Sequence, residues 1–558
     1  MVPEWFPASE LGIILAFVLG FGVVYGLERP DGDWSRHLRS RLLLGLPWGT
    51  LISVGFVVFV YLFVQQGIQD LSNPVVLPFR AWSYFHLGGV VWAGFSHASY
   101  GHLIGNLLGA LVAGSLAEYA WGHFPQSRGT GSFESAWTNP YARAFVVAPG
   151  FVLTTGLLTA VFSIGPVIGF SGVVFAMWGF ALVQYPLGTV VALVGSRLVG
   201  LVWQAFQTPV LEASAGPSFT SPWWAGIAIQ GHAIGLFVGV VAGLLILQGR
   251  DRRPGALRIF AGVLLFAVSR SLWAVYWFRG GETYVLFRAV GVGLIVILAA
   301  LIAAAVAAPG RPLFGSLVSR VTRPSRLTSD PESAVSLRAV AFVLLLVGAA
   351  AIAGPAIPVN LQTTADDPLP GEPLEVEGYE VTYAENIQNG MVSAIEVEAF
   401  GESTAVNTSG VIVRDTDRHL WATAITRSRL AFRGESTVEV GGIGWRETVD
   451  VQRQGWTAAG GDVTYHVSLA HDDKQQTAFL SAPATAEPTI DGRNVTIAAV
   501  AGGFRLRVHH ANKTVSAPLP AQNQSVRVGG LTISRQESNL FAQRNDTTVR
   551  VATAETYE

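Results

Sequence analysis

Polar side chains interrupt otherwise apolar sequence at three places, and the first is the segment 95–108. It carries His97, His102 and Asn106. His102 and Asn106 are four residues apart, so both lie on one face of a helix and can donate hydrogen bonds toward one point. Polar groups are costly in hydrocarbon and often mark a functional site. The alternative is that the histidines lie at a membrane interface and Asn106 ties two helices together.

The second place is the segment 168–175, where Ser171 has Gly169 two positions before it and Gly172 directly after it. Glycines in this pattern allow a tight turn into a helix, with the hydroxyl presented at the turn. A backbone amide of such a turn can point toward a bound oxygen atom. The alternative is that the small residues only let two membrane helices pack closely.

The third place is the segment 230–239, where His232 lies inside an apolar run followed by Gly235 and Gly239. Glycines spaced by four let a second helix approach closely. A helix that carries Ser171 and packs on this face would bring the serine within bonding reach of His232. The alternatives are a proton relay or a simple tie between helices.

Together the three segments predict acyl-transfer chemistry. A serine hydroxyl is a weak nucleophile until a base takes its proton, and His232 is the natural base for Ser171. The tetrahedral intermediate needs fixed hydrogen-bond donors for its oxyanion. We expect these donors at His102, Asn106 and the backbone of residues 169–171, which includes Gly169 and Phe170.

The elements that must position these groups are membrane helices. Half of the 558 residues are hydrophobic and 13% are charged, whereas soluble chains are typically about 25% charged. About 20 apolar residues span a bilayer. Ten candidate segments are expected at 11–27, 42–65, 101–121, 144–162, 170–185, 189–206, 224–247, 256–277, 287–308 and 339–357.

Charge is divided unevenly along the chain. Residues 1–358 hold 20 Lys+Arg and 13 Asp+Glu, a net +7, and the remaining 200 hold 16 and 25, a net −9. Arginines concentrate in the loops after the first, seventh and ninth segments. Placing those loops in the cytoplasm puts the N-terminus and the C-terminal tail outside. The chain is therefore expected to be a multi-pass protein of the cell membrane with an extracytoplasmic tail.

The tail from residue 358 onward is expected to be β-rich. Segments 392–400, 463–469 and 504–508 alternate apolar and polar residues, and Asp366–Pro373 resembles a hinge. One or two small β-sandwiches are the expected fold. The tail histidines have no clear partners in sequence. Five Asn-x-Ser/Thr sequences mark acceptor sites for glycans on an external segment, at Asn407, Asn494, Asn512, Asn523 and Asn545.

The three motifs resemble those of the rhomboid family of intramembrane serine proteases. The matching pieces are His102-x-x-x-Asn106, Gly169-x-Ser171-Gly172 and His232-x-x-Gly235-x-x-x-Gly239, in the family's order. The resemblance implies a six-helix core at 42–248, with an extra helix and loop at 1–41, three more helices at 249–357 and the tail at 358–558.

The resemblance also implies roles for residues. Ser171 would be the nucleophile and His232 the base of a dyad without a third acid, with His102 and Asn106 in the oxyanion hole. Phe175 matches a position that stacks on the catalytic histidine, and Glu118 matches an acidic residue at the inner end of a core helix. His97, Gly172, Gly235 and Gly239 would support the site. The family's adjacent Trp-Arg pair is missing: Arg80, Trp82 and Trp92 are separated.

The expected reaction needs no metal or other cofactor. The expected substrates are single-pass transmembrane proteins within the lipid bilayer, the segment 208–221 is a candidate lid, and no nucleic-acid partner is expected. The chain has no Cys and no His-Glu-x-x-His, which excludes thiol nucleophiles and that class of metalloprotease. Two alternatives stay open, an inactive rhomboid-like binding protein and a transporter, although no repeat of the kind common in transporters is seen.

Overall fold

The computed structural model describes residues 8–28, 34–125, 130–210, 220–248, 253–280, 283–308, 336–393, 398–399, 402–403 and 407–557. The chain divides into two compact units, one of residues 1–278 and 284–361 and the other of residues 279–283 and 362–558. The boundary after residue 361 lies four residues beyond 357, the expected end of the last membrane segment. The finer expected boundaries at residues 41 and 248 stay predictions.

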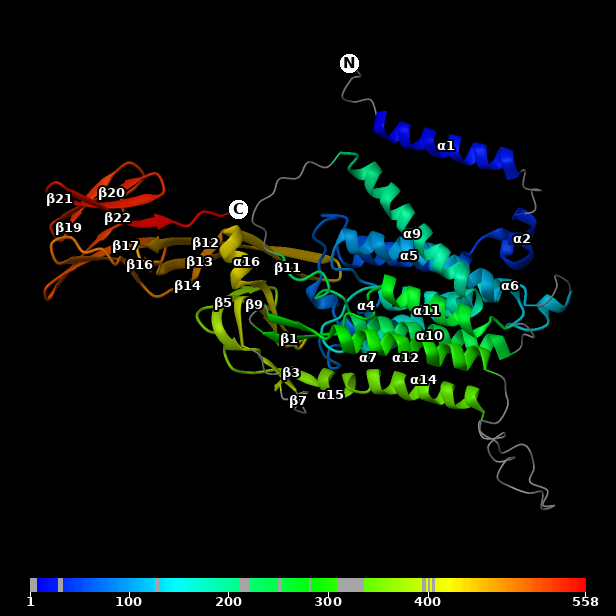
Figure 1. Ribbon diagram of the computed structural model, residues 1–558. Helices are drawn as coiled ribbons and strands as arrows, with labels where there is room; N and C mark the ends of the chain where they lie inside the picture. Colours follow the sequence, from blue (N-terminus) through cyan, green and yellow to red (C-terminus); the bar gives the residue numbers. More distant parts are fainter. Residues whose placement is uncertain are drawn as a thin grey trace. The chain divides into compact units, whose positions relative to one another are not determined.

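The first unit is helical (Figure 1). Its α-helices are α1 (Ala8–Glu28), α2 (Trp34–Arg41), α3 (Trp48–Phe59), α4 (Leu87–Ala93), α5 (Tyr100–Trp121), α6 (Pro140–Ala142), α7 (Ala148–Phe162), α8 (Ser171–Gln184), α9 (Pro186–Gln207), α10 (Ile229–Gln248), α11 (Ala256–Ser269), α12 (Arg288–Ala307), α14 (Leu337–Ala353) and α15 (Ala356–Asn360). Short η helices lie at Leu43–Gly45, Val60–Val64, Leu77–Phe79, Thr130–Phe133 and Arg143–Val147.

Within the described residues, seven helices are long and apolar enough to cross a membrane, and three shorter apolar helices lie at Trp48–Val64, Ser171–Gln184 and Ala256–Ser269. Each of these ten helices overlaps one of the ten expected segments. Buried apolar residues from α3, α5, α8, α10, α11 and α12 form one continuous core. The expectation of a membrane protein is thus confirmed in this coarse sense, by length and composition.

The eighth expected segment, 256–277, is wrong at its C-terminal end, because α11 stops at Ser269. Ser271 has a positive φ of 57°. Its N–H donates to Val268 and the N–H of Leu272 donates to Ala267, which is the bonding pattern that closes a helix end. The chain then forms a hairpin of β1 (Tyr276–Gly280) and β2 (Thr283–Leu286).

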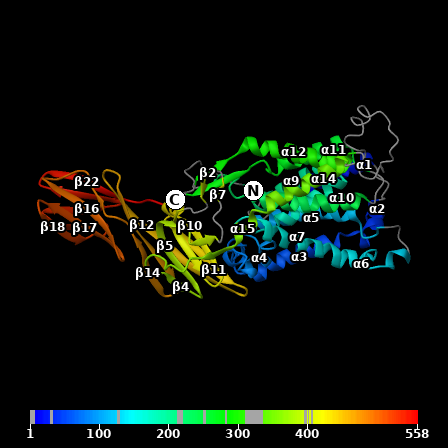
Figure 2. The same cartoon turned by 90° about the horizontal axis from the view of Figure 1, so that it is seen from below.

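The second unit is β-rich, as expected (Figure 2). One helix, α16 (Arg427–Arg433), accompanies its strands. The strands are β3 (Gln362–Thr364), β4 (Leu374–Val376), β5 (Tyr379–Gln388), β6 (Met391–Ser393), β7 (Glu398–Ala399), β8 (Glu402–Ser403), β9 (Asn407–Asp415), β10 (Leu420–Thr426), β11 (Glu435–Gly442), β12 (Trp445–Ala458), β13 (Val463–His471), β14 (Lys474–Leu480), β15 (Ala484–Thr485), β16 (Arg493–Val500), β17 (Gly503–His510), β18 (Lys513–Pro518), β19 (Ser525–Val528), β20 (Leu531–Gln536), β21 (Asn539–Arg544) and β22 (Thr547–Ala554).

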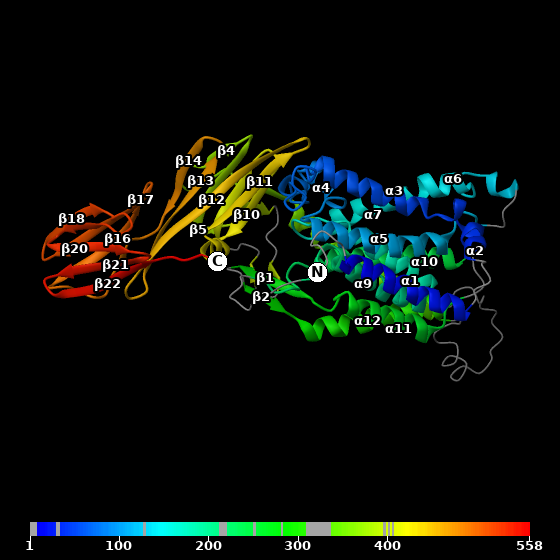
Figure 3. The same cartoon turned by 90° about the horizontal axis from the view of Figure 1, so that it is seen from above.

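The strands form three larger antiparallel sheets in the orders β10-β9-β5-β4, β15-β16-β17-β18 and β14-β13-β12-β22-β21-β20-β19, with β11 on β12. The long strand β12 joins β11 and β13 along most of its length and β22 at its end (Figure 3). One core lies between β15–β18 and the β19–β22 strands, and a smaller one lies on β5, β9 and β10. All five sequon asparagines are exposed.

Candidate active site

The turn before α8 fixes the position of Ser171. Gly169 has φ +133°, a conformation that side chains rarely allow, and its N–H donates to the carbonyl of Ala93 at 2.8 Å. Two residues earlier, the carbonyl of Val167 accepts from Ala81 at 3.1 Å. Ser171 is then the first residue of α8. The first N–H groups of a helix have no partner within it, so those that open α8 are free of bonds within the helix.

Glycines bring α8 and α10 into very close contact. A Cβ at Gly235 would lie 2.0 Å from the carbonyl oxygen of Gly172, and one at Gly239 would lie 1.9 Å from that of Ala176. A Cβ at Gly179 of α8 would lie 2.4 Å from the carbonyl oxygen of Leu236. Any side chain at these positions would push the helices apart. The glycine spacing in the sequence therefore reflects a real close approach of the two helices.

Ser171 and His232 meet across this contact. The Oγ atom of Ser171 lies 2.8 Å from Nε2 of His232. A neutral ring protonated on Nδ1 accepts the hydroxyl proton at Nε2 in this geometry. Within the described part of the chain, Nδ1 of His232 has no hydrogen-bond partner, so no carboxylate orients the ring. Phe175 stacks on it instead, with ring centroids 4.1 Å apart and an interplanar angle of 6°.

Helix α5 supplies the next two residues. Ser99 caps its N-terminus by accepting from the N–H of His102 at 3.3 Å, which places His102 in the first turn. A Cβ at Gly169 would lie 2.7 Å from Cε1 of His102 and 3.7 Å from Oγ of Ser171, so the imidazole lies against the glycine backbone beside the hydroxyl. The His102 ring also packs edge-on against that of His97, at 5.1 Å between centroids.

Asn106 lies one turn further along α5 and is 8% exposed. Its Nδ2 group is buried and has no hydrogen-bond partner among the described residues. Buried donors are nearly always paired, so a donor without a partner calls for an explanation. An oxyanion that forms only during a reaction would provide one.

The expected part of Gly169 in the oxyanion hole needs correction. Its N–H is already bonded to Ala93, so it is not a free donor. Gly169 contributes by lacking a side chain, which leaves space for His102. Phe170 is fully buried and directly precedes α8.

A small cavity of about 20 Å³ adjoins the hydroxyl and is lined by Ser163, Gly169, Ser171, Gly231 and His232, among others. That volume suffices for one water molecule, and the lining offers polar partners. A larger cavity of about 370 Å³ lies elsewhere, against Thr50, Glu118 and Met177, and its lining is mostly apolar.

Two further polar residues of the helices do not bond each other. Arg197 donates to the carbonyl of Ser269 at 2.5 Å. The carboxylate of Glu118 is bound instead by residues 49, 50 and 123. Residues 211–219 of the expected lid lie outside the described residues, as do arginines 29, 250, 252, 311, 320, 323 and 326, which carried much of the orientation argument.

Sequence reasoning missed two amide side chains near the site, those of Gln230 and Asn360. Both contact the chain just before Ser171. The available signal was one strongly polar residue near the start of α10 and one at the end of α15, but nothing in the sequence pairs these residues with the turn, 66 and 195 positions away.

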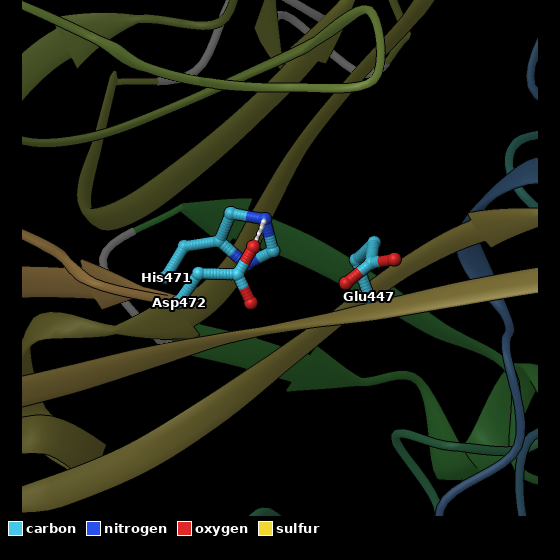
Figure 4. Close-up of side chains that lie close together, drawn as sticks. All are labelled: Glu447, His471 and Asp472. Carbon is cyan, nitrogen blue, oxygen red and sulfur yellow. Dashed lines mark ion pairs between the residues drawn. The ribbon is translucent and has the colours of Figure 1, made fainter.

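In the tail, His471 has closer neighbours than its sequence suggested. Nε2 of His471 lies 3.6 Å from the carboxylate of Asp472, and Glu447 faces them from the neighbouring strand (Figure 4). Nδ1 of His471 is 3.1 Å from the carbonyl of Thr448. The potential ligand atoms lie within 4.8 Å of one another, a spacing that suits a cation and also occurs in ordinary ion pairs.

Comparison with protein family models, with curated proteins and with solved structures finds no match to this chain. The assignment of a function therefore depends on the geometry around Ser171 and on the motifs of the sequence.

Proposed function

We propose that this chain is a serine endopeptidase that cleaves transmembrane proteins within the bilayer. The observation that carries the proposal is the 2.8 Å contact between the Ser171 hydroxyl and Nε2 of His232, which joins two helices of an apolar bundle. A serine paired with a base is the usual arrangement of an activated nucleophile. The motif resemblance to rhomboid proteases supports the same chemistry.

In the proposed reaction, Oγ of Ser171 attacks the carbonyl carbon of the scissile peptide bond while Nε2 of His232 takes its proton. The oxyanion receives hydrogen bonds from Asn106, from His102 and from the free N–H groups that open α8. The C–N bond then breaks, and the proton on His232 goes to the leaving amine. Water attacks the resulting ester with His232 again as base, which releases the new carboxylate and restores the serine.

The proposed substrates are single-pass helices that unwind locally near the outer membrane face. A helix in lipid hides its carbonyl groups in its own hydrogen bonds, so cleavage requires that some of these break. Glycine and proline in the substrate helix would lower that cost. The arginine distribution in the sequence supports a site near the outer face and a tail outside the cell membrane.

Cleavage of a membrane-embedded reporter tests the proposal. The full chain would be reconstituted into liposomes with single-pass reporters that carry Gly and Pro in the upper half of the helix. We expect the wild type to cleave them and Ser171→Ala to be inactive.

Ser53→Ala is the matched control, since Ser53 is a buried serine of α3 that bonds only the backbone within its own helix. It should cleave as the wild type does. Equal cleavage by Ser171→Ala would contradict the assignment. If the folded wild type also failed to react with a fluorophosphonate, the inactive binding protein would be favoured.

A further inference from the structure

Two side-chain amides hold three consecutive residues at the end of α7. Nδ2 of Asn360 donates to the carbonyl of Ser163 at 2.7 Å, and the N–H of Gly165 donates back to its Oδ1 at 3.1 Å. Between them, the N–H of Ile164 donates to Oε1 of Gln230 at 2.6 Å. Because a helix end leaves its carbonyl groups without partners, these bonds fix where the chain leaves α7.

The same amides connect this turn to the last helix of the first unit. Asn360 is the final residue of α15 and is 2% exposed, and its own carbonyl accepts from the N–H of Tyr84 at 3.0 Å. Nε2 of Gln230 donates to the carbonyl of Ile352 in α14 at 2.5 Å. Pro355 interrupts the helix just beyond that carbonyl, because proline supplies no N–H.

The held turn leads directly into the catalytic groups. Gly165 precedes Ser171 by six positions, and Gln230 precedes His232 by two. A Cβ at Gly231 would lie 2.7 Å from Oγ of Ser163, so the start of α10 and the end of α7 are also in direct contact. Ser163 and Gly231 both border the small cavity beside the Ser171 hydroxyl.

We propose that Asn360 and Gln230 are positioning residues: they use the last membrane helix as a support that sets Ser171 against His232. The inference rests on the proposed endopeptidase function. It gives the helix α14–α15, which lies outside the expected six-helix core, a part in positioning the catalytic pair. A displacement of about 1 Å at a reacting group can cost two orders of magnitude in rate.

The test measures the rate at which a fluorophosphonate labels Ser171, together with kcat and KM for a transmembrane reporter. The variants are Asn360→Ala and Gln230→Ala in the full-length protein. The matched control is Gln184→Ala, since Gln184 is a buried amide that bonds the carbonyl of Gly243 at 2.9 Å and joins the same helices α8 and α10 at their other end. Thermal unfolding of all three variants reports their folding.

We expect labelling and kcat to fall about 10- to 100-fold in both amide variants while KM stays near the wild-type value. Gln184→Ala should unfold at a comparable temperature and label at close to the wild-type rate. Equal losses in all three variants, or wild-type rates in the two amide variants, would overturn the inference. If one amide variant does not fold, the other decides.

These outcomes are distinct from failure of the proposed function. If the proposed function is wrong, the fluorophosphonate will not label Ser171 in the folded wild type. The positioning role would then be overturned as well. Wild-type labelling at Ser171 with unaffected amide variants would overturn the positioning role alone.

Discussion

Helix α5 carries two buried polar residues whose surroundings differ sharply. Near its C-terminus, Glu118 is 5% exposed and both carboxylate oxygens are bonded. Oε1 accepts from the N–H of Gly49 at 2.8 Å and lies 2.6 Å from Nε2 of His123. Oε2 accepts from the N–H and the hydroxyl of Thr50, each at 2.8 Å. This cluster has no unused hydrogen-bonding capacity that a ligand would need.

Near the start of the same helix, Asn106 is comparably buried, but its Nδ2 donor is free within the described part of the chain. Nδ1 of His232 in α10 is also without a partner there. Fully bonded buried groups stabilise a fold, whereas an unbonded donor costs free energy until something binds it. The Glu118 cluster therefore holds the helices together, whereas under the proposed function the free donor of Asn106 would bind the oxyanion that forms during the reaction.

The largest expected effect is a loss of kcat when Ser171 or His232 is replaced. Ser171→Ala and His232→Ala should each lower kcat on the order of 10⁴- to 10⁶-fold, because each removes one half of the same proton transfer. The double variant should be no worse than the worse single variant. Steady-state cleavage of the reporter measures this, and losses that multiply would show that the two residues act separately.

The next effect is a loss of stability when the Glu118 cluster is broken. Glu118→Ala leaves the N–H groups of Gly49 and Thr50 buried without an acceptor, and we expect it to cost about 3–5 kcal/mol of unfolding free energy. Denaturant titration in detergent micelles measures the loss. The fraction that stays folded should label with a fluorophosphonate at close to the wild-type rate. A stable variant with impaired labelling would reverse the roles given to the two ends of α5.

Asn106→Ala should show the opposite pattern. Removing one oxyanion donor typically lowers kcat about 10²- to 10³-fold. Unfolding free energy should be unchanged or slightly higher, because the substitution removes a buried donor that has no partner. Steady-state kinetics and denaturant titration of this variant measure the two quantities. A destabilised variant with normal kcat would mean that Asn106 only ties helices together.

The smallest effect concerns Phe175, whose ring stacks on the imidazole of His232. Phe175→Leu keeps an apolar side chain but removes a stacking contact worth about 0.5–1.5 kcal/mol. We expect kcat/KM to fall about 2- to 10-fold, while Phe175→Tyr, which keeps a ring, stays near the wild type. An unchanged rate in Phe175→Leu would indicate that contacts with α8 suffice to orient the imidazole.

Local patterns predicted the helices well, because a run of apolar residues and the spacing of Gly235 and Gly239 are direct consequences of packing in lipid. They also indicated that Ser171 and His232 would meet, since each lies next to a glycine that allows close approach. The end of α11 was misjudged because the sequence is again apolar at residues 272–277, although the bonding at Ser271 closes the helix.

Contacts between distant segments were not predictable in this way. For example, Gly169 bonds Ala93 and Asn360 bonds Ser163 because of how α4, α7 and α15 pack together. Periodicity in the sequence does not predict this packing. In the tail, His471 and Glu447 come from different strands, so their proximity depends on the register between β12 and β13. Contacts between segments that are far apart in the sequence therefore account for most of what the sequence alone did not predict.

The most direct test of the account is to find the residue that reacts with a fluorophosphonate. The full-length wild type would be labelled in liposomes, digested and analysed by mass spectrometry, with His232→Ala treated in parallel. The account predicts one adduct, on Ser171, that is absent or strongly reduced in His232→Ala. An adduct on another residue, no adduct in the folded wild type, or equal labelling of Ser171 without His232 would contradict it.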